Sequence, residues 1–270
     1  PYALSDLIIM GLGALGAACR FATIPALFGA IGAIMIASFS GLIALDGHLV
    51  VPIWRINGVD IGITLAMSLG YLACGLAFFR WRAQDDRCAA YLWAAITAVI
   101  PPLLGAISFA SFGTYSFDFT HFLFGASLGA IALYCADYFA KEHKQNSALA
   151  INTLVTLSFL AFTLSLHAIS ASLWTTVLIP VLGLIYFASS AFRPWRALSW
   201  MIIPALLITM GRFAWEPTIV GADRLWATPV FNQLLIGYGV AAAAALIAAY
   251  LKRNSEDLAL KNVLQALAAL

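Results

Sequence analysis

The polar residues that could do chemistry gather in a few segments between long apolar runs. The richest segment is 211–232, GRFAWEPTIVGADRLWATPVFN, which mixes acids, bases and aromatic residues. Its candidate site residues, which could hold a polar headgroup or a sugar, are Arg212, Glu216, Asp223, Arg224 and Asn232. The alternative is an interfacial loop with aromatic anchors and local ion pairs. Arg212 and Glu216 stand four residues apart, which favours a pair on one helix face.

Asp118 and His121 are the second candidate pair on the outer face. They stand three residues apart at the start of an apolar run, 120–140. Acids are favoured at the N-terminus of a helix because the helix dipole is positive there, so capping is the default prediction for Asp118. A carboxylate beside an imidazole could also handle a proton, and that interpretation stays open.

Few other ionisable residues interrupt the apolar runs, although such residues would mark a functional site within a membrane. Asp137 stands four residues before Lys141, so we predict a local ion pair near the interface rather than a proton relay. Asn152 and His167, in or beside the run 149–166, could form hydrogen bonds between helices.

Familiar catalytic and cofactor motifs are missing from the sequence. It has no H-E-x-x-H, nucleophile elbow or P-loop, and no paired acids suited to metal-dependent glycosyl transfer. The segment 11–16, GLGALG, matches a dinucleotide fingerprint but lies within an apolar run, so it predicts close helix packing, as do Gly125 and Gly129. We therefore predict no metal and no cofactor, and an enzyme is not the favoured class.

The composition indicates a membrane protein. Of 270 residues, 63% are hydrophobic and 10% are charged, and the mean hydropathy is +0.95. A soluble domain carries about 25% charged residues and needs a polar exterior, which this chain cannot supply. The net charge is only +2 and its bases are scattered, so nucleic acid is not an expected partner.

The apolar runs predict an all-α, polytopic transmembrane bundle with about nine spans and the start of a tenth. The runs are 4–19, 24–45, 62–79, 88–109, 120–140, 149–166, 173–192, 198–213 and 229–251, with the tenth beginning near residue 258. They are continuous and about twice as long as barrel strands, which favours helices. We expect residues 1–270 to form a single transmembrane domain, cut at both ends from a longer chain.

The basic residues predict an orientation. Alternate connecting segments hold eleven Lys and Arg in one set and three in the other. Because basic loops stay in the cytoplasm, the first set should be cytoplasmic and residue 1 should lie outside. The four cysteines fall in or beside the predicted cytoplasmic halves, so neither disulfides nor a zinc site is expected.

The helix ends suggest an internal repeat. Segments 72–80 and 133–141 are alike, and the basic ends fall at Arg82, Lys144, Arg196 and Arg253. This spacing predicts a repeated helical hairpin of roughly 55 residues. The alternative is that all inward helix ends look alike, because aromatic and basic residues gather at the interface.

One segment carries a family resemblance. Residues 229–253 begin PVFNQLLIGYGVAA and end in AYLKR. They resemble part of a family of large bacterial polytopic inner-membrane proteins classed only as a domain of unknown function. The resemblance implies a bacterial inner membrane and a longer chain, and it supplies no catalytic residues. Ala241 stands where members of that family often have Pro.

The favoured function is a transporter-like or scaffold module of the bacterial inner membrane. Its expected partners are the lipid bilayer, the remainder of a longer chain or other membrane subunits, and a lipid or sugar could be its ligand. Kinking prolines at positions 101, 102, 180 and 204 support a transporter. The alternative is a membrane-embedded enzyme acting on a lipid-linked glycan at the outer face, with Glu216, Asp223 or Asp118 as acid or base.

Overall fold

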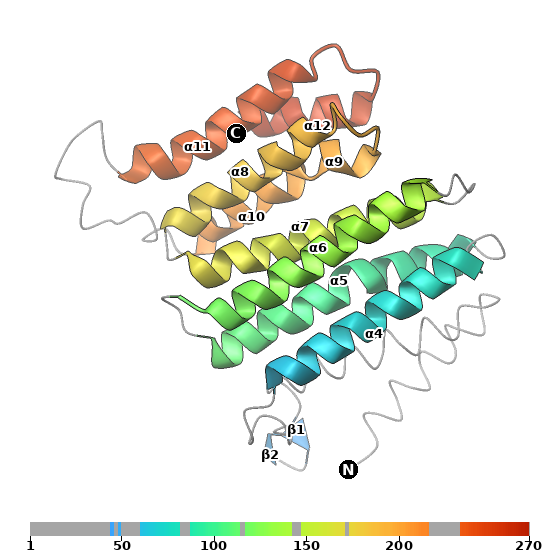
Figure 1. Ribbon diagram of the computed structural model, residues 1–270. Helices are drawn as coiled ribbons and strands as arrows, with labels where there is room; N and C mark the ends of the chain where they lie inside the picture. The colour runs from blue at the N-terminus through green and yellow to red at the C-terminus, as the bar shows by residue number, and fades with distance from the viewer. Residues whose placement is uncertain are drawn as a thin grey trace. The chain divides into compact units, whose positions relative to one another are not determined.

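The computed structural model describes residues 44–45, 48–49, 60–81, 87–113, 117–141, 147–170, 173–215 and 233–269. Nearly all of them are helical, which confirms the predicted all-α class (Figure 1). Apart from turns and connections, the described residues also include a two-residue ladder in which β1 (Ala44–Leu45) pairs antiparallel with β2 (His48–Leu49). The predicted run 24–45 therefore extended two residues too far, and the rest of the first two runs lies outside the described residues.

The chain divides into two compact units. The first comprises residues 1–114 and 118–165, and the second comprises residues 115–117 and 166–270. In the first unit, α5 (Arg87–Phe112) packs against α4 (Asp60–Trp81) and α6 (Phe119–Lys141). Helix α7 (Ser147–Ile169) begins in the first unit and ends in the second.

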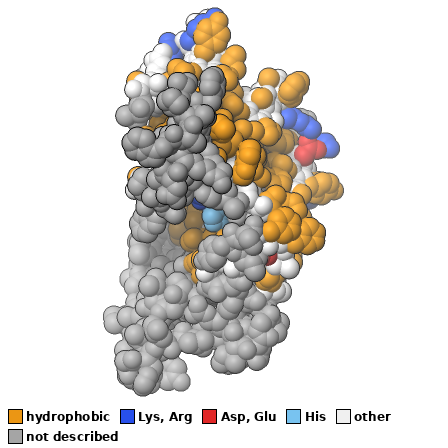
Figure 2. Space-filling model, turned by 90° about the vertical axis from the view of Figure 1, so that its left-hand side faces the viewer, with side chains coloured by type: hydrophobic (Ala, Val, Ile, Leu, Met, Phe, Trp, Pro, Cys, Tyr) orange, Lys and Arg blue, Asp and Glu red, His pale blue; other side chains and the backbone are white. Residues whose placement is uncertain are grey.

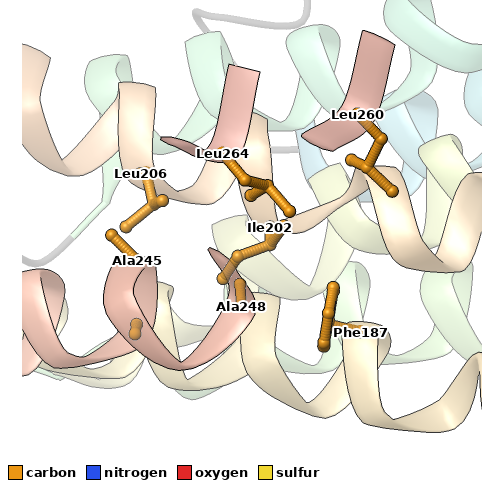
Figure 3. Close-up of a cluster of buried hydrophobic side chains, with 8 residues drawn as sticks. Phe187, Ile202, Leu206, Ala245, Ala248, Leu260 and Leu264 are labelled. Atoms are coloured by element: carbon orange, nitrogen blue, oxygen red, sulfur yellow. The ribbon is translucent and has the colours of Figure 1, made fainter. Parts of the chain in front are cut away.

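The second unit continues with shorter helices: α8 (Leu173–Ser189), α9 (Arg196–Trp200), α10 (Ile202–Trp215), α11 (Gln233–Leu251) and α12 (Leu258–Ala269). Apolar side chains from α8, α10, α11 and α12 point toward one another and form its core (Figure 3). Ile202, Ala248 and Leu264 in this cluster are fully buried. Each predicted run from the third onward overlaps a helix, although α8 ends three residues before the end of the run 173–192 and residues 229–232 lie outside the described residues.

One predicted run is interrupted. Residues 198–213 form one predicted apolar run that Pro204 was expected to kink or interrupt, and a turn at Met201 separates α9 from α10. Pro204 explains the break, because a proline has no N–H to donate to the carbonyl four residues earlier, that of Trp200. The backbone of Met201 stays in the right-handed helical region, so the interruption is local.

Four described helical segments are long and apolar enough to cross a membrane: Ala89–Ala110, Phe119–Lys141, Ala148–Ile169 and Arg196–Ala214. Shorter apolar helices are Thr64–Arg80, Leu173–Ser189, Leu235–Leu251 and Leu258–Ala269. Hydrophobic side chains make up most of the described surface on the face shown in Figure 2. These features fit a membrane-embedded protein.

Close packing and internal hydrogen bonds replace contacts with water inside these helices. The hydroxyls of Thr153 and Thr163 donate to carbonyls of their own helix, four residues earlier. A Cβ at Gly125 would lie 2.5 Å from the carbonyl oxygen of Ala161, and one at Gly129 would lie 2.9 Å from the ring of Phe162. The predicted use of these two glycines in helix contact is confirmed.

Candidate functional site

The start of α6 is built on Asp118, which precedes its first residue. One carboxylate oxygen, Oδ1, accepts hydrogen bonds from the backbone N–H of Thr120 (3.0 Å), the hydroxyl of Thr120 (2.6 Å) and the backbone N–H of His121 (3.0 Å). These bonds satisfy N–H groups that a helix leaves without partners at its N-terminus. The predicted capping role of Asp118 is confirmed.

The other carboxylate oxygen of Asp118 begins a chain of hydrogen bonds that runs to α5. Asp118 Oδ2 lies 2.8 Å from His121 Nδ1, and His121 Nε2 lies 3.1 Å from Ser108 Oγ on α5. A carboxylate can only accept, so the proton of a neutral His121 sits on Nδ1. Its Nε2 then carries the lone pair that accepts from the Ser108 hydroxyl. The sequence prediction brought Asp118 and His121 together, and the structure adds Ser108.

This chain of three side chains is buried at the ends of two membrane-length helices. Ser108, His121 and Asp118 are 1%, 2% and 7% exposed. The Phe109 ring meets the imidazole edge-on, with 5.4 Å between ring centres. Ser108 lies four residues before the last residue of α5, and Asp118 lies directly before the first residue of α6. The site is thus about one helical turn from the ends of both helices.

Ser108 was missed because nothing local marks it. It stands ten residues before Asp118, across the connection between two apolar helices, and serines are common in such helices. A useful signal was the shortness of that connection. Two antiparallel helices joined by a short segment place residues near the end of the first beside residues near the start of the second.

Arg212 belongs to a separate cluster in the second unit. Its Nε donates to the hydroxyl of Thr176 on α8 (3.3 Å), and its Nη1 donates to Nδ1 of His167 on α7 (3.3 Å). The prediction that His167 bonds between helices is confirmed. The remaining candidates of this loop, Glu216, Asp223, Arg224 and Asn232, lie outside the described residues, so the expected pair of Arg212 with Glu216 stays a prediction.

An ion pair and an apolar cavity lie outside these two clusters. Lys141 Nζ lies 2.7 Å from Asp137 Oδ2, which confirms the predicted ion pair within α6. An apolar cavity of about 550 Å³ lies between α10, α11 and α12 and contains none of the predicted site residues. Within the described part of the chain, no group of three His, Cys, Asp or Glu is placed to hold a metal ion.

Comparison with known proteins adds no family. No protein-family model, curated protein or solved structure matches this chain. The buried Ser108–His121–Asp118 chain is therefore the feature of the structure from which we infer a function.

Proposed function

We propose that this chain is a multi-pass protein of the bacterial inner membrane and acts as a transporter-like module that handles a proton at Ser108–His121–Asp118. One observation carries the proposal: a carboxylate, an imidazole and a hydroxyl are linked by hydrogen bonds and buried together in apolar helices. Ionisable groups in such surroundings are costly and are usually functional. The apolar helices and the uneven distribution of basic residues support the multi-pass arrangement with the first residue outside.

The atoms are arranged to accept a proton at His121. A proton arriving at Nε2 turns that atom from an acceptor into a donor, so the Ser108 hydroxyl must rotate and accept instead. The Asp118 carboxylate, 2.8 Å from Nδ1, stabilises the resulting imidazolium. Protonation thus reverses the direction of the hydrogen bond that joins α5 to α6.

A flux experiment tests this proposal. The protein is reconstituted in liposomes that trap a pH-sensitive dye, and proton entry is followed after the external pH is lowered. We expect entry in the wild type to exceed that of empty liposomes, and His121→Gln to abolish the excess. His167→Gln is the matched control, because it removes a half-buried histidine from the second unit.

Asp118→Asn is the second variant, and we expect it to fold even if His121→Gln does not. Asn is as good a helix cap as Asp. Its amide N–H would donate to His121 Nδ1, which moves the ring proton to Nε2 and reverses the bond to Ser108. Structure is retained while the stabilising charge is lost, so proton entry should fall. If wild-type protein and empty liposomes give equal rates, or if His121→Gln matches the wild type, the transporter proposal is wrong and a scaffold role is favoured.

A specific observation also favours an enzyme as the second candidate. The order Ser Oγ, His Nε2, His Nδ1, Asp is the one used by serine nucleophiles. Ser108 Oγ would attack an ester carbonyl while its proton passes to His121 Nε2. The tetrahedral intermediate would expel an alcohol that takes this proton back, and water would then release the acyl group. In this scheme Asp118 orients the imidazole through the bond between its Oδ2 and His121 Nδ1.

The two candidates separate in one labelling experiment. A fluorophosphonate reacts covalently with activated serines. Labelling of the wild type that is lost in Ser108→Ala and in His121→Gln would favour the enzyme. Labelling that is absent from the wild type, with proton entry intact, would leave the transporter-like module. The glycan part of the enzyme hypothesis depends on Glu216, Asp223 or Asp118, and the first two of these lie outside the described residues.

A further inference from the structure

One end of the second unit holds basic side chains over aromatic rings. At the end of α11, Lys252 Nζ lies 5.7 Å from the centre of the Phe187 ring on α8. The guanidinium of Arg253 lies 3.9 Å from the centre of the Tyr250 ring. Beyond α8, the guanidinium of Arg193 lies 5.4 Å from the ring centre of Trp195. The contact between Lys252 and Phe187 brings the α8–α9 and α11–α12 connections to the same end of the unit (Figure 1).

This end carries a surplus of positive charge. Residues 187–200 and 250–261 contain five basic and two acidic side chains. One of the acids, Asp257, is already committed, because its Oδ2 accepts from both Nε (3.2 Å) and Nη2 (3.1 Å) of Arg196. Asp257 also caps α12 through the backbone N–H of Leu260. The surplus of three positive charges therefore fits an anionic partner.

Exposed apolar side chains stand beside these bases. Phe192 is 86% exposed, Tyr250 is 64% exposed and Leu251 is 62% exposed. A soluble anion would gain nothing from such side chains, whereas a phospholipid offers a phosphate to the bases and acyl chains to the rings. Helix α12, with 12 residues, is about 18 Å long and cannot cross the hydrocarbon core. The whole end thus has the composition of a membrane interface.

We infer that the α8–α9 and α11–α12 connections form a binding site for the headgroup of an anionic phospholipid. Lys252 and Arg253 donate to its phosphate, and Phe192 and Tyr250 lie against its acyl chains. The cation–ring contacts hold the basic groups at the height of the headgroup, so less side-chain freedom is lost on binding. This site is independent of the proton chain in the first unit.

Lipid retention tests the inference. The full chain is purified in detergent, mixed with phosphatidylglycerol or phosphatidylcholine, and the bound lipid is counted by native mass spectrometry. Wild-type protein should retain phosphatidylglycerol in preference, and the preference should weaken as salt rises. The Lys252→Gln/Arg253→Gln variant should lower the apparent affinity by roughly thirtyfold at low salt, since each of the two surface bases contributes roughly fivefold.

The matched control is Arg80→Gln/Lys141→Gln in the first unit. It also removes two basic groups from helix ends, one of which lies 5.9 Å from the ring of Tyr138. The control should retain phosphatidylglycerol as the wild type does, and inorganic phosphate should not displace the lipid. Equal retention by the Lys252/Arg253 variant and the wild type would overturn the site. An equal loss of lipid in the control would also overturn the site, because it would show that any surface base serves. Displacement of the lipid by inorganic phosphate would overturn the assignment of the ligand as a phospholipid.

Discussion

At the scale of single residues, Asp118 combines two tasks that substitutions can separate. Oδ1 caps α6, and Oδ2 bonds to His121 Nδ1. Asp118→Ala loses both and should lower the free energy of unfolding by about 1–3 kcal/mol, because it removes a cap and leaves a buried donor without a partner. Asp118→Asn keeps the cap and should cost clearly less. Unfolding in mixed detergent measures both values.

The relative free energies of unfolding of these two variants show whether the cap or the charge of Asp118 matters more. A loss for Asp118→Asn as large as that for Asp118→Ala would mean that the negative charge, and not the cap, holds the start of α6. His121→Gln provides a third point, because it keeps the cap while removing the imidazole between Asp118 and Ser108. We expect its stability to lie near that of Asp118→Asn.

At the scale of helices, the α4–α5 contact depends on the absence of a side chain at Gly75. A Cβ there would lie 2.1 Å from Oγ1 of Thr97, which is fully buried on α5. Gly75→Ala should therefore cost about 1–3 kcal/mol by overpacking, despite the better helix propensity of alanine. Gly70→Ala in the same helix is the control, because nothing lies within 4 Å of its Cβ position.

Gly70→Ala should be neutral or stabilise the protein by up to about 1 kcal/mol. Thermal unfolding of Gly75→Ala and Gly70→Ala in the same detergent measures this difference in stability. If they behave alike, α4 and α5 are free to separate by the small distance that a methyl group needs, and close packing at Gly75 is not required.

Another prediction at this scale concerns the docking of α12. The backbone N–H of Leu260 holds the pKa of the Asp257 carboxyl below its usual range; partial burial opposes this shift, and the Trp200 indole and Arg196 guanidinium add to it. A lowered pKa stabilises the folded state at pH above the usual carboxyl value, and this contribution disappears as the pH falls through the lowered pKa. Between pH 7 and pH 5 we therefore expect no change from this residue.

The comparison with Asp257→Asn isolates this effect. The difference in unfolding midpoint between wild type and variant should be constant near neutral pH and shrink below about pH 4. A difference that shrinks already between pH 7 and pH 5 would point to another titrating group. A difference that never shrinks would mean that the ionised form of Asp257 is not what stabilises this end.

Helices were predictable from the sequence, and the details that depend on distant neighbours were not. Continuous apolar runs bounded by Arg80, Lys141 or Lys252 locate α4, α6 and α11 closely, because charges rarely enter such helices. Pro204 was predicted to kink or interrupt its helix, and the break at Met201 confirms this. The Asp46-Gly47 pair between β1 and β2, a frequent hairpin signal, was overlooked.

The candidate site was predictable in part for the same reason. Asp118 and His121 stand three residues apart, so one helical turn brings them together whatever the rest of the fold does. Ser108 reaches His121 only because α5 and α6 pack as neighbours, and this depends on contacts that no local pattern contains. The bonds of Arg212 to Thr176 and His167 are equally long-range, whereas its expected pairing with Glu216 was a local argument.

At the scale of the whole molecule, the orientation proposed from the basic residues can be tested directly in cells. In a background without the four native cysteines, Thr218→Cys and Gln145→Cys are labelled from outside with a reagent that does not cross the membrane. We expect Thr218→Cys to react and Gln145→Cys not to, because Gln145 follows Lys141 and Lys144 in a predicted cytoplasmic connection.

Each other outcome changes a different part of the proposal. A reversed pattern would place Ser108, His121 and Asp118 at the cytoplasmic ends of α5 and α6, so the proton would enter from the cytoplasm. It would also move the phospholipid site at Lys252 and Arg253 to the outer leaflet, without altering its chemistry. Labelling at both positions would mean that the number of crossings between them is even, which excludes the nine-span arrangement and the repeated hairpins together. The two sites proposed above would survive that result, because each is built within a single compact unit.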